Sequence, residues 1–182
     1  MKKLLFFSYG IFLLALSIFS YVFVDQNLIY LKNLYSGFQS SERTITTIVY
    51  IIFIFIFFFF YFVFLKKAQK KLIKILDLKI LIGLTLLILL FSYSAFTSFD
   101  IFNYLATTKT LFFYKENPYI VMPIEFMGDP LLLFTHAANK IALYGPFWIG
   151  LTSIPYVLGL GNFLLTLFSF KLFVSLFYLG TV

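Results

Sequence analysis

Four stretches of this chain carry no charged residue, and each is long enough to cross a lipid bilayer as a helix. They are Leu4–Val24, Ile45–Leu65, Ile80–Phe99 and Ile141–Phe170. A hydrocarbon core about 30 Å thick needs ~20 helical residues at about 1.5 Å each. The last stretch exceeds one span, and the turn sequence Gly159–Asn162 divides it into Tyr144–Leu158 and a helix from Phe163 onward. We therefore expect an all-α integral membrane protein with about five transmembrane helices.

The composition of the chain excludes an ordinary soluble domain. Hydrophobic residues make up 62%, charged residues 12%, and the mean hydropathy is +1.01. The net charge of +7 does not indicate a nucleic-acid partner, because the basic residues cluster between apolar spans, where they face anionic lipid headgroups. The chain has no cysteine, which excludes disulfides and thiolate metal sites. No cofactor is evident, and a divalent metal has no support in the residue pattern.

The distribution of lysine predicts the orientation in the cell membrane. The first apolar stretch is longer than a signal-peptide core and lacks a cleavage site, so we expect an uncleaved anchor. Lys66–Lys79 is rich in lysine, whereas the loops Asp25–Thr44 and Asp100–Lys140 are mixed in sign. The positive-inside rule then places the N-terminus and Lys66–Lys79 in the cytoplasm and the 98–143 loop outside. Lys66–Lys79 also has one apolar side, which favours a helix on the inner surface.

The chain divides into two parts on this interpretation. Residues 1–79 hold two spans and the lysine-rich connector, and residues 80–182 hold the remaining spans and the 98–143 loop. Apolar residues recur at helical spacing between Ile101 and Phe113, which predicts a short amphipathic helix. Asp129 is a helix-capping residue followed by Pro130, and the apolar residues up to Ile141 predict a second one. The loop is thus expected to carry short amphipathic interfacial helices.

Motifs in a fixed order begin where the third apolar stretch ends. Ser98, Asp100, Phe102 and Tyr104 form a spaced element, a basic residue follows at Lys109, and Asn117-Pro118-Tyr119 and Tyr144-Gly145-Pro146 complete the set. In order and spacing this set resembles the polyprenyl-phosphate-sugar-dependent glycosyltransferases of the GT-C fold, and it looks most like their bacterial mannosyltransferase branch. The resemblance covers residues 80–182. Phe102 stands where the family has tyrosine, and Lys109 stands where it often has arginine. Family members have more spans, so we expect this chain to be the N-terminal portion of such an enzyme.

The resemblance implies an enzyme that moves a mannosyl or other hexosyl group from a polyprenyl-phosphate donor to an acceptor hydroxyl on the outer face, with inversion. The acceptor would be a glycan or a lipid-linked molecule. Asp100 is the candidate catalytic base, and we expect it to be partly buried beside Phe99 and Phe102. The residues expected to bind substrate are Tyr104, Lys109, Asn117, Tyr119 and Tyr144.

Other interpretations of the same residues stay open. Asp100 could have no catalytic role and be only a charged group at the water-facing end of a span. The lysines could likewise extend toward lipid headgroups, as interfacial lysines commonly do. The chain could also be a non-catalytic multi-pass membrane protein, or part of a transporter or flippase for a lipid-linked sugar. A transporter would need broken helices near the bilayer midplane, for which Gly150 and Pro155 give a weak indication.

Overall fold

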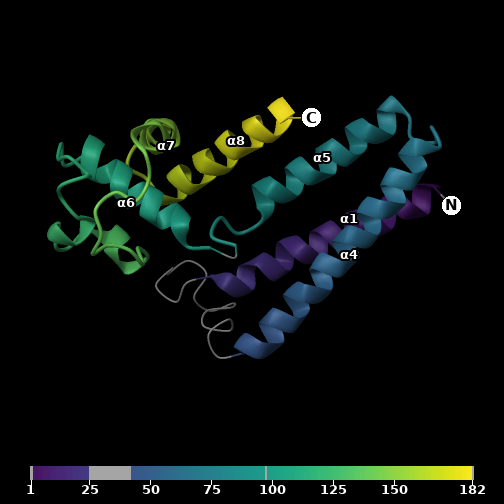
Figure 1. The fold of residues 1–182 in the computed structure, drawn as a ribbon, viewed down its shortest axis with the longest axis horizontal. Coiled ribbons are helices and arrows are strands. Elements are labelled where there is room, and N and C mark those ends of the chain that lie inside the picture. The colour runs from purple at the N-terminus through teal and green to yellow at the C-terminus, as the bar shows by residue number, and fades with distance from the viewer. Residues whose placement is uncertain (1, 25–41, 97, 182) are drawn as a thin grey trace. The chain divides into compact units, whose positions relative to one another are not determined.

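The computed structural model describes residues 2–24, 42–96 and 98–181, and every regular element in these ranges is helical. The predicted loop Asp25–Thr44 therefore lies largely outside the described residues. The described residues form two compact units, which part between Tyr93 and Ser94. The first unit contains α1 (Lys2–Ser20), η1 (Tyr21–Phe23), α4 (Arg43–Gln69) and α5 (Ile75–Phe91), and the second contains α6 (Asp100–Phe112), η2 (Pro123–Glu125), η3 (Pro130–Leu133), α7 (Pro146–Leu158) and α8 (Phe163–Thr181) (Figure 1).

In the part of the chain that the structure describes, three helices are long and apolar enough to cross a membrane. They are Lys3–Phe23, Arg43–Gln69 and Phe163–Thr181, and they correspond to the first, second and fifth predicted spans. Five spans are not shown, because α5 has 17 residues and α7 has 13. Both are shorter than the ~20 residues that a bilayer core needs.

The predicted third span, Ile80–Phe99, is wrong in its bounds, because α5 ends at Phe91. Two residues at the end of α1 and in η1 bind the backbone there. The hydroxyl of Ser20 accepts the N–H of Tyr93 at 2.7 Å, and the hydroxyl of Tyr21 donates to the carbonyl of Phe91 at 2.8 Å. Because side chains satisfy these backbone groups, the helix can stop inside an apolar sequence. A connecting segment therefore separates the end of α5 at Phe91 from the start of α6 at Asp100.

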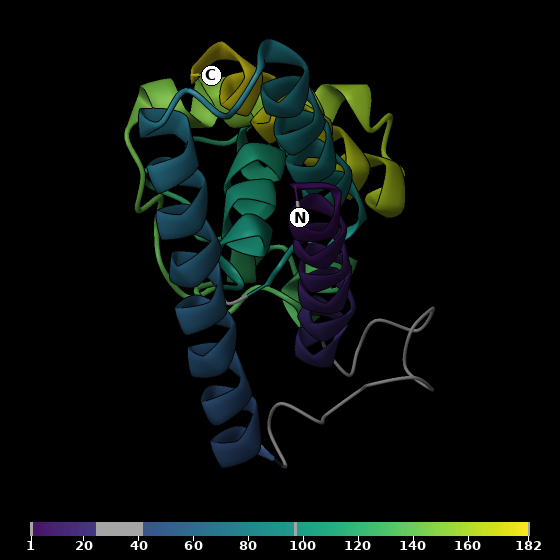
Figure 2. The same cartoon turned by 90° about the vertical axis from the view of Figure 1, so that its right-hand side faces the viewer.

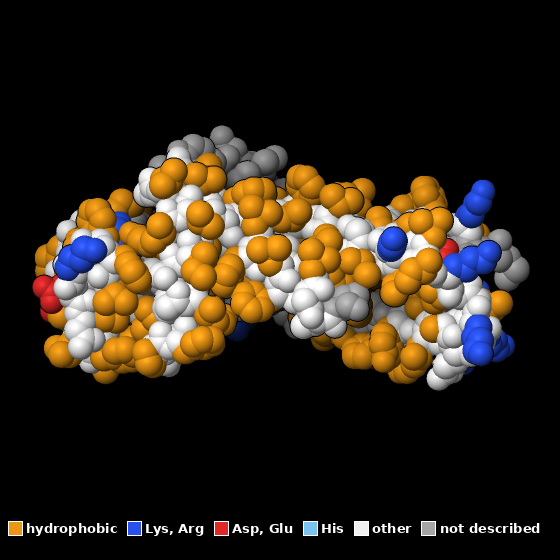
Figure 3. Space-filling model, turned by 90° about the horizontal axis from the view of Figure 1, so that it is seen from above, with side chains coloured by type: hydrophobic (Ala, Val, Ile, Leu, Met, Phe, Trp, Pro, Cys, Tyr) orange, Lys and Arg blue, Asp and Glu red, His pale blue; other side chains and the backbone are white. Residues whose placement is uncertain are grey.

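In the first unit α1 packs against α5 and, through aromatic side chains, against α4 (Figures 1 and 2). Tyr9, Phe12 and Leu13 of α1 form a buried core with Phe60 of α4, and the rings of Tyr9 and Phe60 meet edge to face at 5.2 Å. Much of α4 remains exposed, and Phe55 is 71% exposed. Figure 3 shows apolar side chains over much of the visible surface. A helix that is apolar on all sides is typical of a lipid environment.

The lysine-rich segment Lys66–Lys79 does not form the predicted surface helix. Its first residues continue α4 as far as Gln69, and a turn then leads directly into α5. The carboxylate of Asp77 accepts the backbone N–H of Lys74 at 2.7 Å and so caps the start of α5. The apolar side chains of the segment are therefore divided among the end of α4, the turn and the start of α5, and they do not share one helical face.

In the second unit α7 packs against both α6 and α8. Thr108 of α6 and Thr152 of α7 are both buried, and their hydroxyls form a hydrogen bond of 2.9 Å. Phe102 is fully buried, and its ring lies 5.3 Å from that of Phe134 and 6.2 Å from that of Phe163. α7 is thus the middle helix of the unit, and α6, which carries Asp100, Tyr104 and Lys109, is fixed against it.

The loop agrees with the sequence-based expectation in its first helix and differs in its second. The first predicted helix is α6, but the helix expected between Asp129 and Ile141 is only the single 3-10 turn η3. Asp129 caps that turn as predicted. Beyond η3 the chain forms turns, and there the N–H of Ala137 donates to the side chain of Asn103 at 3.2 Å.

The predicted turn Gly159–Asn162 is confirmed. It joins α7 to α8, and the side chain of Asn162 accepts the N–H of Leu165 at 3.0 Å in the first turn of α8. Gly161 has a φ of +78°, a conformation that glycine adopts without strain.

Candidate functional site

Asp100 is the first residue of α6, and its side chain is exposed instead of partly buried as expected. Its backbone N–H donates to the hydroxyl of Ser98 at 3.2 Å. One carboxylate oxygen, Oδ1, accepts a hydrogen bond from Nδ2 of Asn103 at 3.3 Å. A carboxylate in this position is accessible to a substrate hydroxyl and is held by a neighbour on the same helix face.

Three aromatic rings gather one helical turn beyond Asp100. Tyr104 follows Asp100 by four residues and so lies on the same side of α6. Its ring meets the ring of Tyr144 edge to face at 4.7 Å and the ring of Trp148 at 5.3 Å. We call Asp100, Asn103, Tyr104, Tyr144 and Trp148 the Asp100 cluster.

The two tyrosines of the cluster have raised pKa values, chiefly because they are partly buried. Burial raises the pKa of Tyr144 to about 12, and the neighbouring Tyr104 and Asp100 add to the rise. Burial likewise raises the pKa of Tyr104, with the charge of Asp100 as the second cause. Both phenols therefore stay protonated at neutral pH and can donate a hydrogen bond beside the carboxylate.

The second and third sequence motifs are joined to each other. The side chain of Asn117 accepts the N–H of Tyr119 at 3.0 Å and shapes the turn. The hydroxyl of Tyr119 then donates to the backbone carbonyl of Tyr144 at 2.7 Å, and the N–H of Ala142 donates to the carbonyl of Pro118 at 2.7 Å. Asn117 and Tyr119 thus hold Tyr144 in place beside Tyr104 and are not themselves in the Asp100 cluster.

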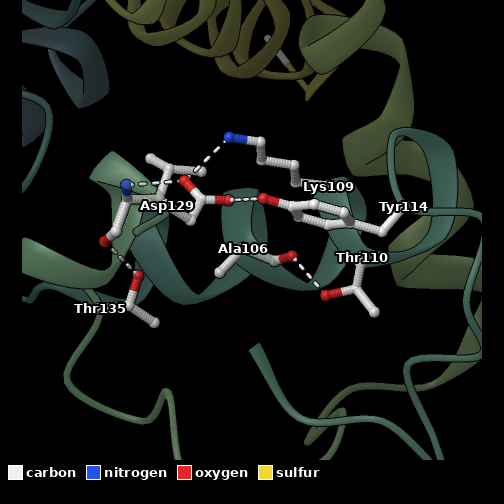
Figure 4. A network of polar contacts seen from close by, with 7 residues as sticks. Ala106, Lys109, Thr110, Tyr114, Asp129 and Thr135 are labelled. Atoms are coloured by element: carbon white, nitrogen blue, oxygen red, sulfur yellow. Dashed lines mark hydrogen bonds and ion pairs between the residues drawn. The ribbon is translucent and has the colours of Figure 1, made fainter. Parts of the chain in front are cut away.

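Lys109 lies away from the Asp100 cluster. Nine residues separate it from Asp100, which on a helix is about two and a half turns, the opposite face and ~13 Å along the axis. Its ammonium group pairs with Oδ1 of Asp129 at 2.8 Å. The hydroxyl of Tyr114 donates to the other oxygen of Asp129 at 2.9 Å (Figure 4). We call Lys109, Tyr114 and Asp129 the Asp129 cluster.

Burial and the carboxylate fix the charge state of the Asp129 cluster. Burial raises the pKa of Tyr114 to about 12, and the hydrogen bond to Asp129 adds to this. For Asp129, burial favours the neutral acid, but hydrogen bonds from Lys109, the N–H of Leu131 and Tyr114 outweigh it, and the pKa of Asp129 is lowered. The charge of Lys109 is thus compensated inside the protein.

The structure brings together only some of the residues predicted from the sequence. Asp100, Tyr104 and Tyr144 are neighbours, Asn117 and Tyr119 support them, and Lys109 is separate. Sequence reasoning missed Asn103 as a partner of Asp100 and Trp148 as a partner of Tyr104. Helical spacing was the available signal for Asn103, because it follows Asp100 by three residues on α6.

His136 lies beside the start of α6. Its ring stacks on the ring of Phe99 with the centroids 4.5 Å apart and the planes at 18°. Within the described ranges, no three His, Asp or Glu side chains gather closely enough to hold a metal ion.

Comparisons with protein-family models, with curated proteins and with solved structures gave no match to this chain. The chemistry assigned to the Asp100 cluster therefore depends on its own residues and on the ordered motifs.

Proposed function

We propose that this chain is a membrane glycosyltransferase, or the N-terminal part of one, of the GT-C type. It moves a mannosyl or other hexosyl group from a polyprenyl-phosphate donor to an acceptor hydroxyl of a glycan or a lipid-linked molecule. The observation that carries the proposal is the Asp100 cluster, in which an exposed carboxylate lies near Tyr104 and Tyr144, and the ring of Tyr104 also packs against Trp148. Three helices apolar enough to cross a membrane and the ordered motifs support it.

The cluster has the groups that sugar transfer needs. Aromatic rings pack against the C–H faces of a sugar, and neutral phenols donate to its hydroxyls. Asp100 would accept the proton of the acceptor hydroxyl. The acceptor oxygen then bonds to the anomeric carbon from the side opposite the phosphate. The bond between that carbon and the phosphate oxygen breaks, and polyprenyl phosphate leaves with the electron pair, which inverts the anomeric centre.

The leaving phosphate needs a cation, and the structure changes which one we propose. Lys109 already pairs with Asp129, so we give it a structural part in place of the phosphate contact that the resemblance implied. Lys140 is exposed and lies four residues before Tyr144 of the Asp100 cluster, so it is the better candidate.

We also propose the orientation that the lysine distribution predicts. The N-terminus and the lysine-rich turn between α4 and α5 lie in the cytoplasm, and residues 98–143 lie outside the cell. The acceptor and the sugar would then meet on the outer face of the cell membrane.

The test is the substitution Asp100→Asn, which keeps the shape of the side chain and removes the base. Membranes containing the wild-type or variant protein are incubated with a labelled polyprenyl-phosphate hexose, and release of polyprenyl phosphate together with labelled product is measured. We expect Asp100→Asn to lower transfer by about a hundredfold or more, the contribution typical of general base catalysis.

The matched control is Glu116→Gln, which removes one negative charge from an exposed residue of the same loop. It should transfer sugar at the wild-type rate. Membrane content and protease resistance of both variants must equal those of the wild type. Unchanged transfer by Asp100→Asn under these conditions overturns the assignment of the base and favours a non-catalytic role.

A further inference from the structure

Asn103 connects two parts of the second unit through the two ends of its amide. It is 8% exposed and lies one turn into α6. Its Nδ2 donates to Oδ1 of Asp100 at 3.3 Å, and its Oδ1 accepts the backbone N–H of Ala137 at 3.2 Å. The residue therefore links the proposed catalytic carboxylate to the segment that follows η3.

The two partners fix which way the amide points. The N–H of Ala137 is only a donor, so it requires the oxygen of the Asn103 amide, and the carboxylate of Asp100 accepts the N–H₂ group at the other end. If the amide were flipped, its NH₂ group would face the N–H of Ala137 and its oxygen would face the carboxylate of Asp100. Neither contact could then be a hydrogen bond. The backbone contact thus guarantees that Asp100 receives a donor.

An exposed aspartate at a helix start would otherwise sample several rotamers, and each wrong rotamer places the base away from its substrate. A hydrogen bond from a buried amide restricts this freedom. The segment that fixes the amide is itself packed against the start of α6, since His136 stacks on Phe99.

We propose that Asn103 is a positioning residue that holds the Asp100 carboxylate in one orientation for proton transfer. This inference rests on the proposed function. Asn103 does not touch the sugar in this scheme. It acts through Asp100. The 134–138 segment fixes the amide of Asn103, and the amide in turn orients the carboxylate of Asp100.

The informative substitution is Asn103→Asp. It has the same shape and keeps an oxygen for the N–H of Ala137, but it replaces the donor facing Asp100 with a second carboxylate oxygen. We expect kcat to fall on the order of tenfold or more with KM close to the wild-type value, because orientation of the base and not sugar binding is disturbed. The acidic limb of the pH profile should move to higher pH, because two carboxylates in contact share one proton.

Asn139→Asp is the matched control, because it makes the same chemical change at an exposed position of the same loop. It should match the wild type in kcat, KM and pH profile. Asn103→Ala removes both contacts, and we expect it to lower kcat as well and to increase protease cleavage within residues 134–138.

A second measurement does not depend on sugar transfer. A water-soluble carbodiimide modifies carboxyl groups in their protonated form, and mass spectrometry follows the modification of Asp100 over a range of pH. In Asn103→Asp the midpoint of modification should move to higher pH than in the wild type and in Asn139→Asp. An unmoved midpoint would show that the two side chains are not in contact and would overturn the inference.

The two proposals fail separately. If Asp100→Asn abolishes transfer while Asn103→Asp retains the wild-type kcat and pH profile, Asn103 is not a positioning residue and the proposed function stands. If Asp100→Asn leaves transfer intact, the proposed function fails and the positioning role fails with it, whatever the carbodiimide midpoint.

Discussion

The ammonium nitrogen of Lys109 lies 2.8 Å from Oδ1 of Asp129, and the two side chains are only 19% and 6% exposed. The pair joins the last turn of α6 to the residue that caps η3. Tyr114 adds a hydrogen bond to the same carboxylate, and its ring stacks on that of Phe126 at 3.7 Å. A single buried carboxylate thus fixes the path of the chain between α6 and η3.

Removal of Lys109 should destabilise the second unit. Lys109→Met keeps the apolar stem but leaves the charge of Asp129 buried without a cation. Breaking a buried pair in this way costs about 3 kcal/mol, and the remaining bonds from Tyr114 and Leu131 keep the cost near that value or below it. Thermal unfolding in detergent measures the loss, and Lys115→Met at an exposed position should leave the unfolding temperature unchanged.

The same cluster predicts a loss of stability in acid. The pKa of Asp129 in the folded chain lies below its ordinary value of 3.8, so the unfolded chain binds the proton more tightly. The stabilisation from this group is complete above pH ~4 and is lost as the pH falls through the lower folded-state value. Unfolding temperature measured between pH 7 and pH 2 should therefore fall in that acidic range.

The variant Asp129→Asn separates this group from the other carboxylates. It cannot ionise, so the part of the acid destabilisation that belongs to Asp129 should be missing from its profile. An acid profile identical to that of the wild type would show that Asp129 does not contribute.

Gly159 is required where α7 turns into α8. A Cβ atom at this position would lie 2.7 Å from the Cα of Thr166, closer than real Cβ atoms approach. Gly159→Ala should therefore push the two helices apart and lower stability by about 1–3 kcal/mol. Gly150→Ala is the control, because a Cβ there meets nothing within 4 Å. In the interior of α7 it should raise stability by roughly 0.5–1 kcal/mol. Thermal unfolding should show a lower unfolding temperature for Gly159→Ala and a higher one for Gly150→Ala than for the wild type.

The sequence predicted correctly those elements whose ends are marked by local residues, such as charges or glycines. α4 follows the uncharged run Ile45–Leu65 closely, and the turn between α7 and α8 lies at the predicted glycines. The end of α5 could not be predicted, because the backbone there forms hydrogen bonds with the side chains of Ser20 and Tyr21, which are far away in the sequence. Tertiary contacts of this kind leave no local signal.

For the candidate site, local spacing was enough to put Asp100 and Tyr104 on one face of a helix. It was not enough for Lys109, whose partner Asp129 lies twenty residues away along the chain. The same limit hid the contact between Asn103 and Ala137. Contacts between loop residues and a helix that is distant in the sequence cannot be predicted from local spacing in a single sequence.

The proposed orientation can be tested directly because the chain has no cysteine. A single cysteine introduced as Glu116→Cys lies in the 98–143 loop, and Lys70→Cys lies in the turn between α4 and α5, and both positions are exposed. A maleimide that does not cross membranes should label the first variant in intact cells and the second only after the cells are opened. Labelling of Lys70→Cys alone in intact cells would invert the orientation. It would place the Asp100 cluster in the cytoplasm, where the outer-face reaction proposed for it could not take place.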